Sequence, residues 1–340
     1  MSAAPFAPTL KSSLRKQLVN RRARLQNTIS DLRRPDHNEP EDLLRLLSEV
    51  DSALTRVDHD DYGMCKVCLT PVAEEDIAAN PMTSYCLCDL SSERQRALER
   101  DLDLAWQVQA ALLPPLDLNI AGWQTHYRYV PHGVVSGDYC DLIPNADATE
   151  LYFMLGDVSG KGVAASLLMA HLNAALRTLA QAGLPPQEVM AKANRLLSAS
   201  SLTTHYATLV CGRAKSSGEI ELVNAGHCEQ LIVRASGHIE VLRDGGLPLG
   251  LIGDSATQYP VARLVLNTGD ALVLYTDGLT DATNSNGEDY DSQRLIDAIK
   301  RARNCSPRDL IAHCLADLSL FLGAAERGDD LTMMVLARNG

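Results

Sequence analysis

The sequence lacks a long uncharged apolar stretch and a leader-like N-terminus. No segment of the 340 residues reaches the roughly 18 to 20 apolar residues that are needed to cross a bilayer. The first ten residues, MSAAPFAPTL, contain neither a basic region nor a long apolar run. We therefore expect a cytoplasmic protein that is neither exported nor inserted in a membrane.

The chain also has fewer basic than acidic residues. The chain has 31 Lys and Arg against 43 Asp and Glu, which gives a formal net charge of −12. Because this average field repels phosphate backbones, it argues against direct nucleic-acid binding. No internal repeat or low-complexity tract is present. A length of 340 residues with 46% hydrophobic residues predicts two domains with at least one substantial core.

The cysteines are too unevenly spaced for a disulfide framework. Four of the nine fall within residues 65–88, as Cys65-Lys-Val-Cys68 and, seventeen residues later, Cys86-Leu-Cys88. Four thiolates in two short turns suit one tetrahedral structural Zn²⁺ in a reducing compartment. The second pair is C-x-C where C-x-x-C is usual, so its geometry should be tighter.

The residues around these cysteines, about 43–90, resemble the zinc finger of DksA/TraR proteins. That resemblance implies contact with RNA polymerase as one role of the module. Two other readings of the residues stay open, a zinc site that only stabilises a small domain and a redox-responsive thiol switch.

Apolar residues at helical spacing predict three long N-terminal helices. The segment 11–34 carries eight Lys or Arg and one acid, whereas 36–61 carries nine acids and two Arg. We expect these two segments to form a hairpin whose oppositely charged arms pack together. A third apolar face, over 93–115, predicts a helix that ends at Pro114 and Pro115. This helix either connects the two parts of the protein or pairs with its copy in a homodimer.

From residue 120 onward, short β-rich runs alternate with two helical pairs. The runs are 151–155, 206–212, 220–223, 231–233, 271–276 and 331–337, and the helical pairs are 163–181 with 186–200 and 291–303 with 307–322. Strands and helices that come in blocks indicate an α+β class, in which sheets are covered by helices.

A set of aspartates lies at the ends of these β-runs or in glycine-containing turns. They are Asp138 in VSGDYCD, Asp157 in LGDVSGKG, Asp277 in YTDGLTDA, and Asp329 with Asp330 in RGDDLTMMV. Carboxylates are hard ligands that suit Mg²⁺ or Mn²⁺. A single Asp-Gly is more often only a turn, but the combined set predicts a site for two ions that activate water against a phosphate.

Five blocks, LYFMLGDVSGKGVAASLLMAHL, LVNAGHCEQLIV, GGLPLGLIGD, GDALVLYTDGLTDA and GDDLTMMVL, occur in this order. In order and flanks they resemble the metal-dependent serine/threonine phosphatases of the SpoIIE and RsbU type, over about residues 117–338. The resemblance implies an α-β-β-α sandwich like that of protein phosphatase 2C, and direct hydrolysis of phosphoserine or phosphothreonine. It also implies the ligands of two Mn²⁺ or Mg²⁺ ions: Asp157 bridging, Asp138 and the Val158 carbonyl on one ion, Asp277 and Asp329 on the other, and Asp330 as a supporting or alternate ligand.

One loop departs from the family pattern, and two other residues stay ambiguous. Cys228-Glu229-Gln230 replaces the Asn-Pro-Pro that usually follows NAGH in this family. His227 is either a general acid or a structural histidine in a turn, and Lys161 either attracts phosphate or is a solvated residue at a helix start.

The sequence thus predicts a helical hairpin and zinc-ribbon domain at 1–92, a connecting helix at 93–115 and a catalytic domain at 116–340. The substrate that the resemblance implies is a small phosphorylated anti-anti-sigma (STAS) protein. The alternative is a non-enzymatic transcription regulator that binds RNA polymerase through the DksA/TraR-like module. The intact aspartate set favours the enzyme, because a scaffold has no need of five acids that repel one another.

Overall fold

The computed structural model describes residues 8–32, 41–58, 62–65, 71–79, 81–83, 92–199, 206–251, 259–302 and 305–339. The chain divides into two compact units, Met1–Glu99 and Arg100–Gly340. The boundary falls inside helix α4 (Ser92–Leu112).

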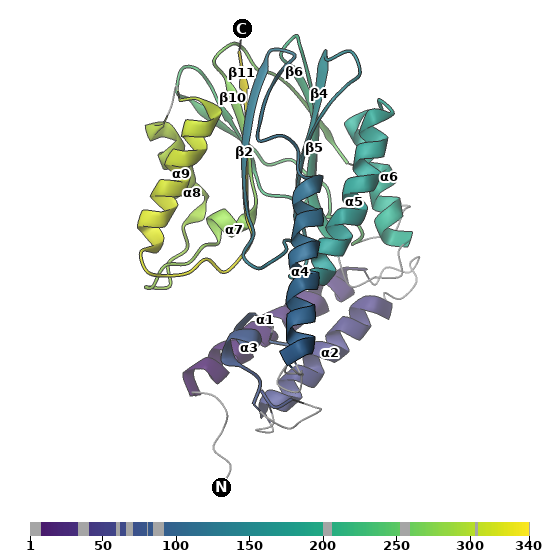
Figure 1. Ribbon diagram of the computed structural model, residues 1–340, viewed down its shortest axis with the longest axis vertical. Coiled ribbons are helices and arrows are strands. Elements are labelled where there is room, and N and C mark those ends of the chain that lie inside the picture. Colours follow the sequence, from purple (N-terminus) through teal and green to yellow (C-terminus); the bar gives the residue numbers. More distant parts are fainter. Residues whose placement is uncertain are drawn as a thin grey trace. The chain divides into compact units, whose positions relative to one another are not determined.

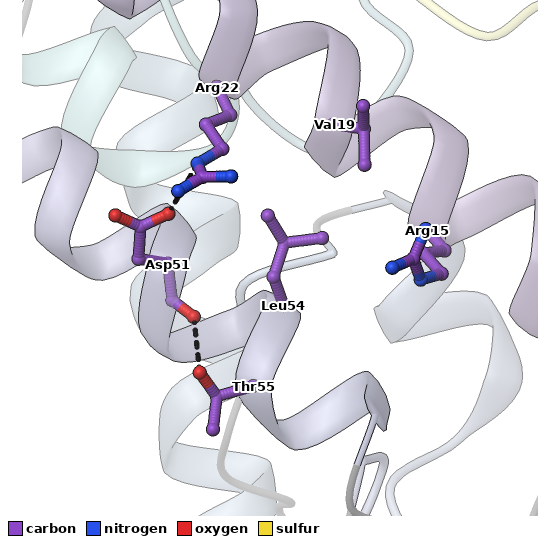
Figure 2. A pocket seen from close by; sticks show the side chains of 6 residues that line it. All are labelled: Arg15, Val19, Arg22, Asp51, Leu54 and Thr55. Atoms are coloured by element: carbon purple, nitrogen blue, oxygen red, sulfur yellow. Dashed lines mark hydrogen bonds and ion pairs between the residues drawn. The ribbon is translucent and has the colours of Figure 1, made fainter.

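The N-terminal unit is built on a helical hairpin of α1 (Pro8–Leu32) and α2 (Glu41–Asp58), followed by the short helix α3 (Glu74–Ala79). Leu14 and Leu18 of α1 are buried with Val50 and Val57 of α2. Figure 2 shows the surface hollow between the two helices, where Arg22 pairs with Asp51 at 2.7 Å. The predicted packing of a basic arm on an acidic arm is confirmed.

Of the four predicted zinc ligands, only Cys65 belongs to the described residues. It is buried in the core of this unit, just after a β-bridge between Met64 and Pro71. Cys68, Cys86 and Cys88 lie outside the described residues. The zinc finger therefore stays a prediction.

The second unit is a sandwich of two antiparallel sheets. One has the order β1-β2-β11-β10-β7-β8 and the other the order β3-β4-β5-β6-β9. The first sheet comprises β1 (Asp117–Ile120), β2 (Trp123–Val130), β7 (Gln230–Val233), β8 (Ile239–Leu242), β10 (Ala271–Tyr275) and β11 (Leu331–Arg338). The second comprises β3 (Asp138–Pro144), β4 (Glu150–Val158), β5 (Ala207–Lys215), β6 (Glu219–Ala225) and β9 (Val261–Val265).

Helices cover the outer face of each sheet (Figure 1). Helices α5 (Val163–Gln181) and α6 (Pro186–Ala199) pack on the β3–β9 sheet, and α8 (Asp291–Arg301) and α9 (Pro307–Leu322) pack on the other. The four-residue helix α7 (Asp277–Thr280) follows β10. The predicted α-β-β-α architecture and both helical pairs are confirmed, whereas β1, β2, β3, β8, β9, α3 and α7 were not predicted.

Strand β4 shows why the central strands read as continuous apolar runs. Tyr152 and Met154 face the helices, while Leu151, Phe153 and Leu155 face the opposite sheet. Successive side chains of a strand point to opposite faces, so both sets are buried when both faces are covered.

Helix α5 is long and apolar enough, by length and composition alone, to cross a membrane. Its buried side chains, Leu168, Met169, Leu172 and Leu176 among them, pack in the core cluster between α5, α6 and the sheet. Its hydrophobicity is therefore that of a core helix.

Candidate metal-dependent active site

Strand pairing places the predicted aspartates at matching ends of the two sheets. Asp138, the first residue of β3, lies directly opposite Asp157 of β4 in the antiparallel register. Asp277 follows β10, and Asp329 and Asp330 precede β11, which pairs with β10. The prediction that these residues lie at strand ends is confirmed.

Asp138 is held by two threonines that sequence reasoning missed. The Asp138 side chain is 1% exposed, and its Oδ2 accepts hydrogen bonds from Thr276 Oγ1, at 3.1 Å, and from Thr332 Oγ1. Burial, and then the Asp157 charge, raise the pKa of Asp138 well above its usual range. The one feature of the sequence that could have indicated these threonines is that each lies within two residues of a predicted acid.

The carboxylates of the site repel one another. Burial, followed by the charges of Asp277, Asp329 and Asp330, raises the pKa of Asp157 to about 8. Burial and the charges of Asp281 and Asp329 also raise the pKa of Asp277. A divalent cation would relieve this repulsion, since an opposite charge favours the ionised form of each acid.

Among the residues that the structure describes, no three Asp, Glu, His or Cys side chains converge tightly enough to make a ready-formed metal site. The donors nevertheless fit Mn²⁺ or Mg²⁺, because they are carboxylate oxygens and the Val158 carbonyl. Gly137 leaves the space beside them open: a Cβ there would lie 2.9 Å from the Val158 carbonyl oxygen and 3.3 Å from Asp157 Oδ1.

Asp330 supports the neighbouring loop. Its Oδ1 accepts a hydrogen bond from the His132 amide at 2.7 Å, and its Oδ2 accepts one from the Gly137 amide at 2.9 Å. The backbone carbonyl of Asp330 packs against Gly278, where any larger residue would clash because its Cβ would lie 1.8 Å from the Asp330 carbonyl oxygen. With both carboxylate oxygens bonded to backbone amides, the supporting role is favoured over that of an alternate ligand.

A glutamine on α4 completes this support and was also missed by sequence reasoning. The Gln109 side chain donates to the Ser136 carbonyl at 2.8 Å and accepts from the Ser136 amide at 2.9 Å. The Ser136 hydroxyl in turn accepts a hydrogen bond from the Asp138 amide at 3.0 Å. Gln109 is only 5% exposed, which is low for a polar residue on a helix. This burial arises from tertiary packing, so the sequence of the helix did not indicate it.

His227 occupies a structural position. Its Nδ1 lies 2.8 Å from Thr208 Oγ1, and its amide donates to Asn224 Oδ1 at 2.7 Å. Burial lowers the pKa of His227 to about 4, so the ring is neutral near pH 7. These contacts favour the structural alternative over a general acid. Cys228, next in the chain, is partly buried, and burial and the Asp277 charge raise the pKa of its thiol.

Comparison with known proteins agrees with this architecture. The family model described as Stage II sporulation protein E (SpoIIE) matches residues 147–339, more than half of the chain. The chain belongs to the SpoIIE family. The match contains Asp157, Asp277 and Asp329, whereas Asp138 lies just before it.

Two curated relatives match this SpoIIE-family chain at similar identity. Protein IcfG of Synechocystis is 26% identical over 267 residues, which are 70% of this chain and 42% of IcfG. Phosphoserine phosphatase RsbU of Bacillus subtilis is 26% identical over 248 residues, 72% of each protein. The chain therefore spans less than half the length of one of these relatives.

Among solved structures, the SiaA-PP2C domain of Pseudomonas aeruginosa is similar with a TM-score of 0.63 at 19% identity. The similarity covers 73% of this chain and 99% of the SiaA domain. It places the sandwich unit in the protein phosphatase 2C fold.

Proposed function

We propose that this chain is a metal-dependent protein serine/threonine phosphatase. The single observation that carries the proposal is the group of aspartates at the matched ends of the two sheets, in a chain that belongs to the SpoIIE family. The similarity to a curated phosphoserine phosphatase supports the same reaction class.

In this proposal Asp157, Asp138, the Val158 carbonyl, Asp277 and Asp329 would hold the two ions, with Asp157 as the ligand that both would share. The chemistry that Mn²⁺ or Mg²⁺ supplies in such sites is activation of a water molecule and stabilisation of charge on the phosphoryl group. Thr276 and Thr332 orient Asp138, and Asp330 orients the loop before it.

The direct test is phosphate release from a phosphoserine peptide by the full chain, with Mn²⁺, with Mg²⁺ and with EDTA. We expect release only with a divalent ion. A protein that is folded and binds Mn²⁺ but releases no phosphate from the peptide or from an aryl phosphate would refute the proposed activity.

The substrate in this proposal is a phosphorylated anti-anti-sigma (STAS-type) protein, in a partner-switching pathway of the cytoplasm. The family membership and the similarity to RsbU support this substrate class. The test compares kcat/KM for a phosphorylated STAS protein with that for an unrelated phosphoserine peptide; equal values would refute a dedicated substrate.

The N-terminal residues are proposed to regulate this activity as a zinc module, with residues 93–115 as the connection or as a homodimer contact. A stiff helix transmits rotation, which a flexible linker would not. The test compares kcat/KM of the full chain, of a chain that begins at Arg100 and so keeps Gln109, and of a variant with four glycines at 102–105. Equal values in all three would refute transmission and leave a docking role, for which RNA polymerase is the candidate partner.

A further inference from the structure

Lys161 is a cation in direct contact with the acidic group. It lies in the short loop between β4 and α5, flanked by Gly160 and Gly162, which have φ angles of 101° and 74°. Its ammonium nitrogen lies 3.0 Å from Asp329 Oδ2 and donates to the Gly328 carbonyl. Arg327, the nearest basic residue in the chain to Asp329, instead donates to the Val130 carbonyl at 3.3 Å.

The Lys161 charge reaches beyond Asp329. It lowers the pKa of both Asp157 and Asp277, against the larger effects of burial and of the other acids. The ammonium therefore lies within electrostatic range of three of the four proposed ligand carboxylates.

The contact between Lys161 and Asp329 can exchange. The two side chains are 42% and 45% exposed, and an ion pair in water contributes only about 0 to 1 kcal/mol. An ammonium group carries three donors and a compact charge, which suits phosphate oxygens. A lysine that gives up Asp329 would thus still lie at the site, with its charge unpaired.

We propose that Lys161 is the phosphate-binding residue of this site and that it competes with a divalent ion for Asp329. When Asp329 turns to the ion, the Lys161 ammonium binds the phosphoryl oxygens of a phosphate monoester. This inference rests on the proposed phosphatase function and names the residue that recognises its substrate group.

The competing explanation is mechanical: Lys161 only fastens its loop to the loop before β11. The two explanations predict opposite signs for metal affinity in a Lys161→Ala variant. If Lys161 competes for Asp329, its loss frees a ligand and removes a repelling charge, so Mn²⁺ binds more tightly. If Lys161 is a fastener, its loss loosens Asp329, so Mn²⁺ binds more weakly.

The test uses calorimetry on the full chain with two probes, Mn²⁺ alone and then inorganic phosphate added to the Mn²⁺-saturated protein. For Lys161→Ala we expect about threefold to tenfold tighter Mn²⁺ binding and about tenfold weaker phosphate binding, as loss of one charge-assisted hydrogen bond implies. Lys161→Arg should recover most of the phosphate affinity. Lys300→Ala is the matched control, because Lys300 also pairs with an exposed aspartate, at 3.1 Å from Asp297, away from the site.

Weaker binding of both probes, unchanged binding of both, or tighter Mn²⁺ with unchanged phosphate would each overturn the proposal. Because neither titration requires turnover, these outcomes are independent of the phosphatase assay. A wild-type protein without Mn²⁺-dependent phosphate release would refute the proposed function, while the titrations would still decide the role of Lys161.

Discussion

Gln109 and Ser136 are joined by two hydrogen bonds of opposite direction, at 2.8 and 2.9 Å, between a side chain of α4 and the backbone of the loop that leads to Asp138. The pair is buried, and Ser136 continues the contact through its hydroxyl to the Asp138 amide. One side chain thus connects the end of the long helix to a proposed metal ligand.

Replacing Gln109 with leucine should lower both stability and activity. Two buried backbone groups of Ser136 would lose their partners, each at a cost of about 1 to 3 kcal/mol in the free energy of unfolding. Displacement of Asp138 should also reduce Mn²⁺-dependent kcat/KM by about tenfold or more, because small misplacements of catalytic groups are costly. Urea unfolding and steady-state kinetics measure the two effects.

Gln107, which is exposed on the same helix, provides the matched control, Gln107→Leu. If both leucine variants behave like the wild type, the Gln109 contact does not position the loop.

Removing a central carboxylate should abolish turnover without unfolding the protein. Asp157→Ala and Asp277→Ala each delete a proposed ligand, and each also removes a repelling charge, so stability should hold or rise. We expect at least about a 100-fold loss of Mn²⁺-dependent phosphate release. Asp297→Ala, at an exposed position on α8, should be fully active, and full activity in either site variant would refute the two-ion assignment.

The stability of the metal-free protein should fall as the pH rises. The pKa of Asp157 is about 8 in the folded chain and 3.8 without these surroundings, so the folded state binds more protons between these values. In EDTA, the free energy of unfolding should therefore decrease from about pH 4 to about pH 8. Saturating Mn²⁺ should weaken or reverse this slope, since a cation favours the ionised form. Asp157→Asn should make the slope shallower, and the raised pKa values of Asp138 and Asp277 should leave part of it in place. A slope unchanged in Asp157→Asn would contradict the assignment.

The ion pair between the buried Asp141 carboxylate and the partly exposed Arg177 should stabilise the protein more than an ion pair between two exposed side chains. The Asp141 side chain is fully buried in β3 and accepts from Arg177 Nε at 2.8 Å and Nη2 at 2.9 Å, which fastens α5 to the sheet. Arg177→Met leaves that carboxylate without its counter-charge and should lower the free energy of unfolding by about 3 kcal/mol.

The matched control for this ion pair is the exposed pair of Lys215 and Glu219. Lys215→Met should cost less than about 1 kcal/mol. Equal losses of unfolding free energy in the two methionine variants would contradict the larger contribution expected of the pair with the buried carboxylate.

The purified protein should carry about one tightly held Zn²⁺, distinct from the exchangeable ions of the proposed phosphatase site. Elemental analysis after purification under reducing conditions measures it. Zinc that is absent, or that persists in a Cys65→Ser/Cys68→Ser variant, would contradict the proposed site.

Much of the fold was determined by local sequence patterns. Apolar residues at a 3.6-residue spacing predicted α1, α2, α5 and α6, and buried runs such as LYFML predicted β4, because both signals depend only on which faces of an element are covered. The weaker strands escaped prediction. β1 and β9 are edge strands whose residues are only partly buried, and β3 opens with polar residues of the site itself.

The sequence by itself determined which acids are the candidates for the proposed site, because Asp157, Asp277 and Asp329 lie within motifs whose order resembles that of a family. It could not determine what holds them. Thr276 and Thr332 meet Asp138 only because β10, β11 and β3 bring their ends together, and Gln109 meets Ser136 across 27 residues of chain. These contacts depend on the pairing of distant segments, which follows from burial of the whole sandwich core. A local pattern of residues therefore cannot predict them.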